Sequence, residues 1–118
     1  MVRAMHVTIW HNPGCSKSRQ ALALLNDRGL EPTVRRYLKD SPTEAEIRTV
    51  LKQLGAKSPH DLVRKRDKMY KALSVGEMDG EQAIVAMAEN SSLIERPVVI
   101  AGDAARIGRP TDAILEIL

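Results

Sequence analysis

One change of pattern near the N-terminus constrains the fold more than any other feature of this chain. Residues 6–10 are rich in β-branched and aromatic side chains, which is typical of a strand. Residues 11–14 are turn formers, and residues 21–25 carry alanine and leucine at helical spacing. A second strand is predicted at residues 33–38. Two strands joined by a helix predict a parallel pair with a right-handed crossover.

The rest of the chain predicts helices, then a hairpin and a last helix. About residues 41–90 form the helical segment, in which Ser41-Pro42-Thr43-Glu44 has the form of a capping box. Residues 97–100 and 105–107 flank a turn and predict an antiparallel hairpin. The order β-α-β, helical insertion, β-β-α predicts one α/β domain over residues 1–118, in which residues 1–4 are an N-terminal extension.

Charge, cysteine content and hydropathy limit the partners that we expect. The formal net charge is +3 and the basic residues are scattered, whereas nucleic-acid binding needs a concentrated basic face. A single cysteine excludes an internal disulfide and a zinc site of several thiolates, and it fits a reducing cytosol. No apolar run approaches the roughly 20 residues of a membrane span. We therefore expect a cytoplasmic protein that binds neither nucleic acid nor membrane.

The single cysteine, Cys15, falls at the predicted start of the first helix. The first N–H groups of a helix lack internal partners and the helix dipole is positive there, so both favour a thiolate. Gly14 allows the backbone to approach a bound anion closely. His11 could tune the thiolate or could simply end the strand, and the sequence alone leaves both alternatives open.

The neighbours of Cys15 favour a nucleophile over a buried structural cysteine. They are polar residues and turn formers, whereas a structural cysteine is usually surrounded by apolar side chains. Ser18 occupies the place of the second cysteine in a Cys-x-x-Cys motif, so redox chemistry would need outside thiols, most simply glutathione and a glutaredoxin. The residues expected to support the loop are Asn12, Gly14, Ser16 and Ser18.

Three arginines stand at the edges of predicted elements. Arg96 and Arg109 each precede a proline, and Arg64 lies within the helical segment. The planar guanidinium donates bidentate hydrogen bonds and keeps its charge, which suits a tetrahedral oxyanion. Any one of them alone is more often a surface residue.

Five separated motifs together resemble the glutaredoxin-coupled arsenate reductase family. The resemblance spans about residues 5–118, and its Cys-Ser-Lys-Ser-Arg loop is similar to a subgroup of chromosomal reductases. Better-known members carry Gly-Thr-Ser after the cysteine, where this chain has Ser16-Lys17-Ser18, so the substrate stays open. The motifs are residues 11–19, 37–38, 62–65, 95–99 and 106–110.

The resemblance implies a thioredoxin-like fold with a helical insertion between the second and third strands of a mixed four-stranded sheet. It implies that Cys15 is the nucleophile, that Arg64, Arg96 and Arg109 bind the oxyanion, and that the bond before Pro97 is cis. The family position of His11 is linked to a lowered cysteine pKa. No metal or bound cofactor is implied; glutathione is the co-substrate, glutaredoxin the partner, and the protein a monomer in arsenic detoxification.

Three functions are compatible with these residues. The first is reduction of arsenate, or a similar oxyanion, through a covalent adduct on Cys15. The second is a glutathione-dependent thiol-disulfide reductase, which uses Cys15 but does not need the arginines. The third is a non-enzymatic redox regulator that binds RNA polymerase, which Ser18 disfavours because no internal disulfide can form.

Overall fold

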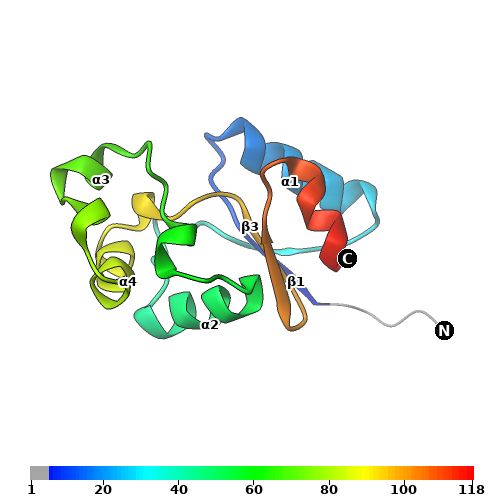
Figure 1. Ribbon diagram of the computed structural model, residues 1–118. Helices are drawn as coiled ribbons and strands as arrows, with labels where there is room; N and C mark the ends of the chain where they lie inside the picture. The colour runs from blue at the N-terminus through cyan, green and yellow to red at the C-terminus, as the bar shows by residue number, and fades with distance from the viewer. Residues whose placement is uncertain (1–5) are drawn as a thin grey trace. The chain divides into compact units, whose positions relative to one another are not determined.

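The computed structural model describes residues 6–118, and the predicted extension at residues 1–4 lies outside the described residues (Figure 1). The described chain forms two compact units. The sheet unit consists of the residues up to Arg36 together with Arg96–Leu118, and the helical unit consists of Tyr37–Glu95.

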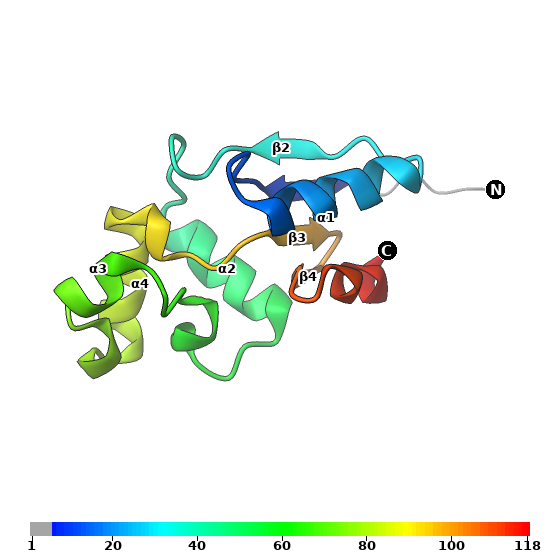
Figure 2. The same cartoon turned by 90° about the horizontal axis from the view of Figure 1, so that it is seen from above.

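The sheet unit contains a mixed four-stranded sheet, as predicted. Its strand order is β2-β1-β3-β4, with β1 parallel to β2 and the other neighbours antiparallel (Figure 2). The parallel pair and the C-terminal hairpin confirm the predicted fold class. The strands are β1 (Val7–Trp10), β2 (Thr33–Arg35), β3 (Val98–Ala101) and β4 (Ala104–Ile107).

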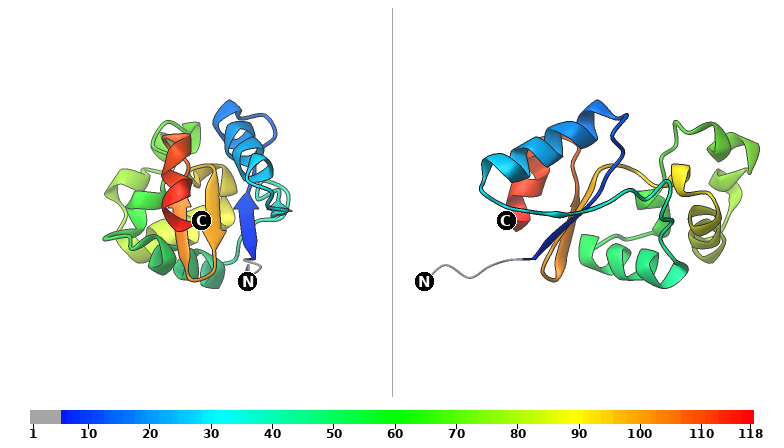
Figure 3. Two further views of the ribbon diagram at one scale, coloured as in Figure 1. Left: turned by 90° about the vertical axis from the view of Figure 1, so that its right-hand side faces the viewer. Right: turned by 180° about the vertical axis from the view of Figure 1, so that it is seen from behind.

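Two helices cover one face of this sheet, namely α1 (Ser16–Asp27) and the 3₁₀ helix η4 (Thr111–Ile117), which lie side by side (Figure 3). Because side chains alternate along a strand, every second residue of β1 and β3 points toward these helices. The apolar side chains that meet there form the core of the sheet unit. This core consists of Val7, Ile9, Ala21, Leu25, Val99, Ala101 and Ile114.

Two predicted details of the sheet unit are wrong. The strand predicted at residues 33–38 ends at Arg35, because its partner β1 ends at Trp10, which pairs with Arg35. One further hydrogen bond, from the His11 N–H to the Arg35 carbonyl at 2.8 Å, closes the ladder. The last helix forms 3₁₀ turns, which are common at chain and helix ends.

The helical unit contains three α-helices and three 3₁₀ turns among its residues. The N-cap of α2 is Thr43, whose side chain and that of Glu46 form a capping box, so the predicted cap at Ser41 is wrong. Gly55 ends α2 in the left-handed conformation at φ 67°, which is typical of glycine after the last residue of a helix. The elements are α2 (Glu44–Leu54), η1 (Pro59–Leu62), α3 (Lys68–Ala72), η2 (Val75–Glu77), α4 (Gly80–Glu89) and η3 (Ser91–Leu93).

Candidate functional site

The strand register brings three separate turns of the sheet unit to one edge of the sheet. Trp10, the last residue of β1, pairs with Val98, and Val98 pairs with Ile107. The chain just beyond Trp10 leads to Cys15, the chain just before Val98 carries Arg96, and the chain just after Ile107 carries Arg109. Three stretches that are distant in the sequence therefore meet at this edge.

The loop that carries Cys15 is held by its own hydrogen bonds. The Cys15 N–H donates to the Asn12 carbonyl at 3.0 Å, and the Gly14 N–H donates to Asn12 Oδ1 at 2.9 Å. Arg19 Nη1 donates to the Pro13 carbonyl at 2.8 Å, which ties the first turn of α1 back to the loop. Asn12 thus organises the loop, while Ser16 is the exposed first residue of α1.

The surroundings of Cys15 favour its thiolate. Partial burial raises the pKa of the Cys15 thiol, but the Ser18 backbone N–H, the Arg96 side chain and the Lys17 backbone N–H together outweigh it. The net effect lowers the pKa below its ordinary value of 9.0. Because the thiolate is the nucleophilic form, these contacts raise the reactivity of Cys15.

Arg109 completes this group. Its Nη2 lies 3.8 Å from the Cys15 sulfur, and its Nε donates to the Arg96 carbonyl oxygen at 2.7 Å. Arg109 is exposed and Arg96 is half-buried, so two cationic side chains lie beside a partly exposed sulfur. An anion with several oxygens would find hydrogen-bond donors and positive charge at this place.

The two arginines are linked through the backbone of the residues beside them. The Gly108 N–H donates to the Pro97 carbonyl at 2.9 Å. Gly108 also packs on the Pro97 ring so closely that an added Cβ would lie 2.8 Å from Pro97 Cγ. The peptide bonds before Pro97 and Pro110 are both cis, whereas the family resemblance implied only the first of them.

His11 and Ser18 are both buried, and their side chains contact each other. His11 Nδ1 lies 2.6 Å from Ser18 Oγ, and the Asn12 N–H donates to the same oxygen at 3.0 Å. Burial lowers the pKa of His11 below 6.5, and the positive charges of Arg36 and Arg19 lower it further. The imidazole is therefore neutral at neutral pH.

Arg64, the third predicted arginine, belongs to the helical unit. Its N–H donates to the Leu93 carbonyl at 2.6 Å, beside a short antiparallel bridge between Val63 and Ile94. Its Nη1 lies 3.7 Å from Asp67 Oδ1, so a carboxylate orients the guanidinium. The structure thus brings Cys15, Arg96 and Arg109 together within the sheet unit and holds Arg64 within the helical unit.

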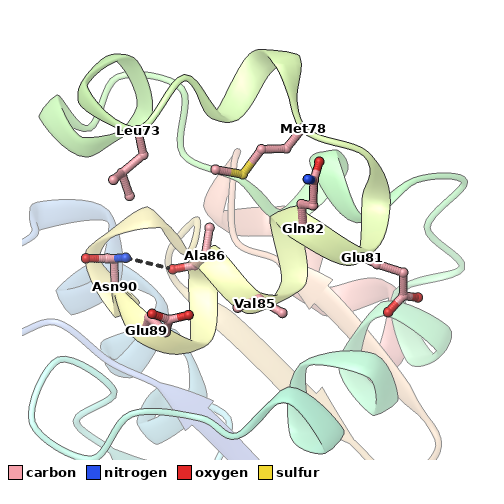
Figure 4. Close-up of a pocket in the computed structure, with 8 residues that line it drawn as sticks. All are labelled: Leu73, Met78, Glu81, Gln82, Val85, Ala86, Glu89 and Asn90. Carbon is pink, nitrogen blue, oxygen red and sulfur yellow. Dashed lines mark hydrogen bonds between the residues drawn. The ribbon is translucent and has the colours of Figure 1, made fainter.

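The helical unit also contains an open pocket of about 430 Å³ beside α4 (Figure 4). Its lining combines the apolar Leu73, Met78, Val85 and Ala86 with the polar Glu81, Gln82, Glu89 and Asn90. None of the residues predicted to form the site lines this pocket. The sequence did not predict this pocket, because apolar residues on a helix ordinarily pack in the core and do not indicate a cavity.

Metal-binding clusters and membrane-spanning helices are absent from the described part of the chain. Within residues 6–118, no group of three or more His, Cys, Asp or Glu side chains could hold a metal ion. No helix of the same residues is long and apolar enough to cross a membrane.

Comparisons with known proteins point to one family. A family model described as the ArsC family matches residues 10–117. A Haemophilus influenzae protein named "Arsenate reductase" is 45% identical over 116 residues, which cover 97% of this chain and 100% of that protein. A Neisseria meningitidis serogroup A protein of the same name is 38% identical, over 95% of this chain and 97% of that protein. The solved structure "Arsenate reductase from Vibrio cholerae" is similar with a TM-score of 0.95 and 43% identity, over 98% of this chain and 100% of that chain.

Proposed function

The chain belongs to the ArsC family, and from this premise we propose that it reduces arsenate to arsenite with Cys15 as the nucleophile. One observation carries the proposal: a thiol with a lowered pKa lies beside two arginines, one of them 3.8 Å from the sulfur. A nucleophile and fixed positive charge at one place are what attack on an oxyanion requires. The names of the relatives supply arsenate as the oxyanion.

The substrate would bind through charge and hydrogen bonds. Arg96 and Arg109 neutralise the arsenate oxygens, and the backbone N–H groups of the first turn of α1 donate to them. Arg64, which Asp67 orients, is proposed as a third oxyanion-binding arginine. Because guanidinium groups keep their charge at every relevant pH, they stabilise the charge that develops as the sulfur attacks.

The covalent cycle needs two further thiols. The Cys15 sulfur attacks arsenic and water leaves, which gives a sulfur–arsenic(V) bond. Glutathione condenses at the same arsenic and a second water leaves. A glutaredoxin thiol then attacks the glutathione sulfur. The bond between that sulfur and arsenic breaks and leaves its electron pair on arsenic, while a glutaredoxin–glutathione disulfide forms. Hydrolysis of the remaining bond releases arsenite and returns the Cys15 thiol.

The presence of a single cysteine supports a cycle in which the other two thiols come from glutathione and glutaredoxin. Arsenic(V) gains two electrons, and two thiols supply them by forming a disulfide. Since the chain has only Cys15, an internal disulfide cannot form, and outside thiols must complete the reduction. Such thiols are kept reduced in the cytosol. We therefore propose a cytoplasmic monomer that takes glutathione as co-substrate and glutaredoxin as partner in arsenic detoxification.

The test is arsenite production by the purified protein with arsenate, glutathione, glutaredoxin and recycling of oxidised glutathione, with each component omitted in turn. We expect turnover only in the complete mixture. Turnover without glutaredoxin would show that the reaction does not need glutaredoxin. No turnover in the complete mixture would overturn arsenate as the substrate.

Arginine variants separate this reaction from thiol-disulfide exchange. Arg96→Gln and Arg109→Gln should each lower arsenate turnover by about 10²-fold, the typical cost of removing one stabilising donor. Reduction of a glutathionylated protein should change far less, because that substrate carries no oxyanion. Arg28→Gln, at the other end of α1, is the matched control and should leave both reactions unchanged. Equal losses in both reactions would favour the thiol-disulfide reductase.

A further inference from the structure

We propose that Lys17 makes the site selective for thiols that carry carboxylates, of which glutathione is one, by attracting those carboxylates to the rim of the Cys15 loop. The inference rests on the proposed function, because it takes glutathione as the thiol that reacts at Cys15. It gives a role to a charged side chain that the proposed reaction cycle does not use.

Lys17 lies beside the reactive sulfur. It is the second residue of α1, directly after Ser16, and its backbone N–H is one of the hydrogen-bond donors that lower the pKa of Cys15. Its side chain is exposed, so the ammonium group can move on its flexible stem over the space next to the sulfur. A molecule that is bonded to the sulfur therefore comes within reach of this ammonium group.

The charge of Lys17 is not neutralised by the protein. Among residues 6–118, its ammonium group has neither an ion-pair nor a hydrogen-bond partner. The first turn of α1 contains no acidic residue, and the positive end of the helix dipole disfavours a cation there. The neighbouring Arg19, by contrast, donates to the Pro13 carbonyl at 2.8 Å. Lys17 is thus a cation in an unfavourable place, and the approach of an anion would relieve the repulsion.

Two different anions must come to this site, and Lys17 suits the second of them. Arsenate meets Arg96 and Arg109, and Arg109 Nη2 lies 3.8 Å from the sulfur. Glutathione has two carboxylates and one ammonium group, so it arrives with a net negative charge after arsenate has filled the space beside the arginines. An exposed lysine attracts its carboxylates without holding them in one geometry, because an ammonium group is a compact point charge.

The experiment measures disulfide exchange at Cys15. The thiolate attacks one sulfur of a disulfide, the sulfur–sulfur bond breaks, and a mixed disulfide forms as the other thiolate leaves. The reagents are oxidised glutathione, which is anionic, hydroxyethyl disulfide, which is neutral, and cystamine, which is cationic. Intact mass follows the formation of each mixed disulfide. Dividing the rate with each charged disulfide by the rate with the neutral one removes any change in the reactivity of the Cys15 thiolate.

The expected changes have opposite signs for the two charged disulfides. Lys17→Gln should lower the relative rate of oxidised glutathione about threefold and raise that of cystamine by a similar factor, the size expected of one exposed charge pair. Lys17→Glu should enlarge both changes, whereas Lys17→Arg should keep the wild-type ratios because it keeps the charge. The changes should shrink in about 1 M salt, where the screening length is about 3 Å.

The matched control is Lys52→Gln, which removes an exposed lysine from the last turn of α2 and changes the net charge by the same amount. It should leave both ratios unchanged. Unchanged ratios in Lys17→Gln would overturn the proposal, as would equal changes in Lys52→Gln, since net charge and not position would then govern the preference. Slower exchange with all three disulfides at constant ratios would show that Lys17 acts on the thiolate, and it would also overturn the proposal.

The assay contains no arsenate, so this inference and the proposed function can fail separately. The expected charge preference in a protein that makes no arsenite would defeat arsenate as the substrate and leave Lys17 as the selecting residue. Arsenite production by a protein whose ratios do not depend on Lys17 would leave the proposed function standing and defeat this inference.

Discussion

Replacing Gly108 by alanine should disturb the positions of both arginines of the sheet unit. An added Cβ would lie 2.8 Å from Pro97 Cγ and 3.5 Å from Ile114 Cγ2, inside the buried edge where β3 and β4 meet. Ordinary contact begins at 3.4 Å. The Pro97 ring and the Gly108 backbone must therefore move apart by about 0.6 Å, the difference between 2.8 and 3.4 Å.

This displacement has two consequences of different size. Overpacking of this kind costs about 1–3 kcal/mol of the free energy of unfolding. The Arg96 carbonyl, next to Pro97, accepts the Nε hydrogen bond of Arg109, so a shift of the ring reaches both guanidinium groups. Since a misplacement of about 1 Å can cost about 10²-fold in rate, we expect about a tenfold loss in kcat/KM for arsenate.

The assay pairs urea unfolding with arsenate turnover and uses Gly102→Ala as the matched control. Gly102 lies in the turn of the same hairpin with φ 59°, and an added Cβ there would meet no heavy atom within 4 Å. Its replacement costs about 1–2 kcal/mol through backbone strain alone. We expect Gly102→Ala to lose stability without losing kcat/KM, whereas Gly108→Ala loses both. A Gly108→Ala protein with wild-type kcat/KM would refute the claim that packing on Pro97 sets the arginine positions.

Three further perturbations have outcomes that the structure predicts. Cys15→Ser should abolish arsenite production while circular dichroism shows an unchanged fold; substantial remaining activity would exclude Cys15 as the nucleophile. Because the folded state lowers the pKa of His11 below 6.5, the unfolded state takes up a proton first as the solution is acidified. The free energy of unfolding should therefore be fully maintained above pH 6.5 and decrease below it. In urea titrations, His11→Asn should show a smaller decrease than wild type. An equal decrease in the two proteins would mean that other groups cause the loss of stability. Asp79→Ala removes the side chain that accepts the Gln82 N–H at 2.8 Å at the start of α4. The free energy of unfolding should therefore fall by about 1 kcal/mol in the same titrations. No change would mean that water replaces the cap.

The sequence predicted the architecture because its local patterns are strong and agree with one another. Residues 6–10 and 97–107 have strand composition, and the crossover rule left one arrangement for the parallel pair. The end of β2 could not be predicted, because it depends on where its partner β1 ends and not on residues 36–38 themselves.

The candidate site was predictable only in part for a similar reason. The loop motif identified Cys15, and chemistry suggested the arginines, but their approach depends on the register of Trp10, Val98 and Ile107. The contact between His11 and Ser18 left no signal in the sequence. It joins the end of a strand to the first turn of a helix, and neither residue type requires the other there.

The measurement that tests the central claim most directly is the intact mass of the protein after brief exposure to arsenate and glutathione without glutaredoxin. We expect one arsenic and one glutathionyl group to accumulate on Cys15. Glutaredoxin should remove them with release of arsenite, and Cys15→Ser should acquire neither. Arsenite release from a protein on which Cys15 remains unmodified, or the same adduct on the Cys15→Ser variant, would contradict this expectation.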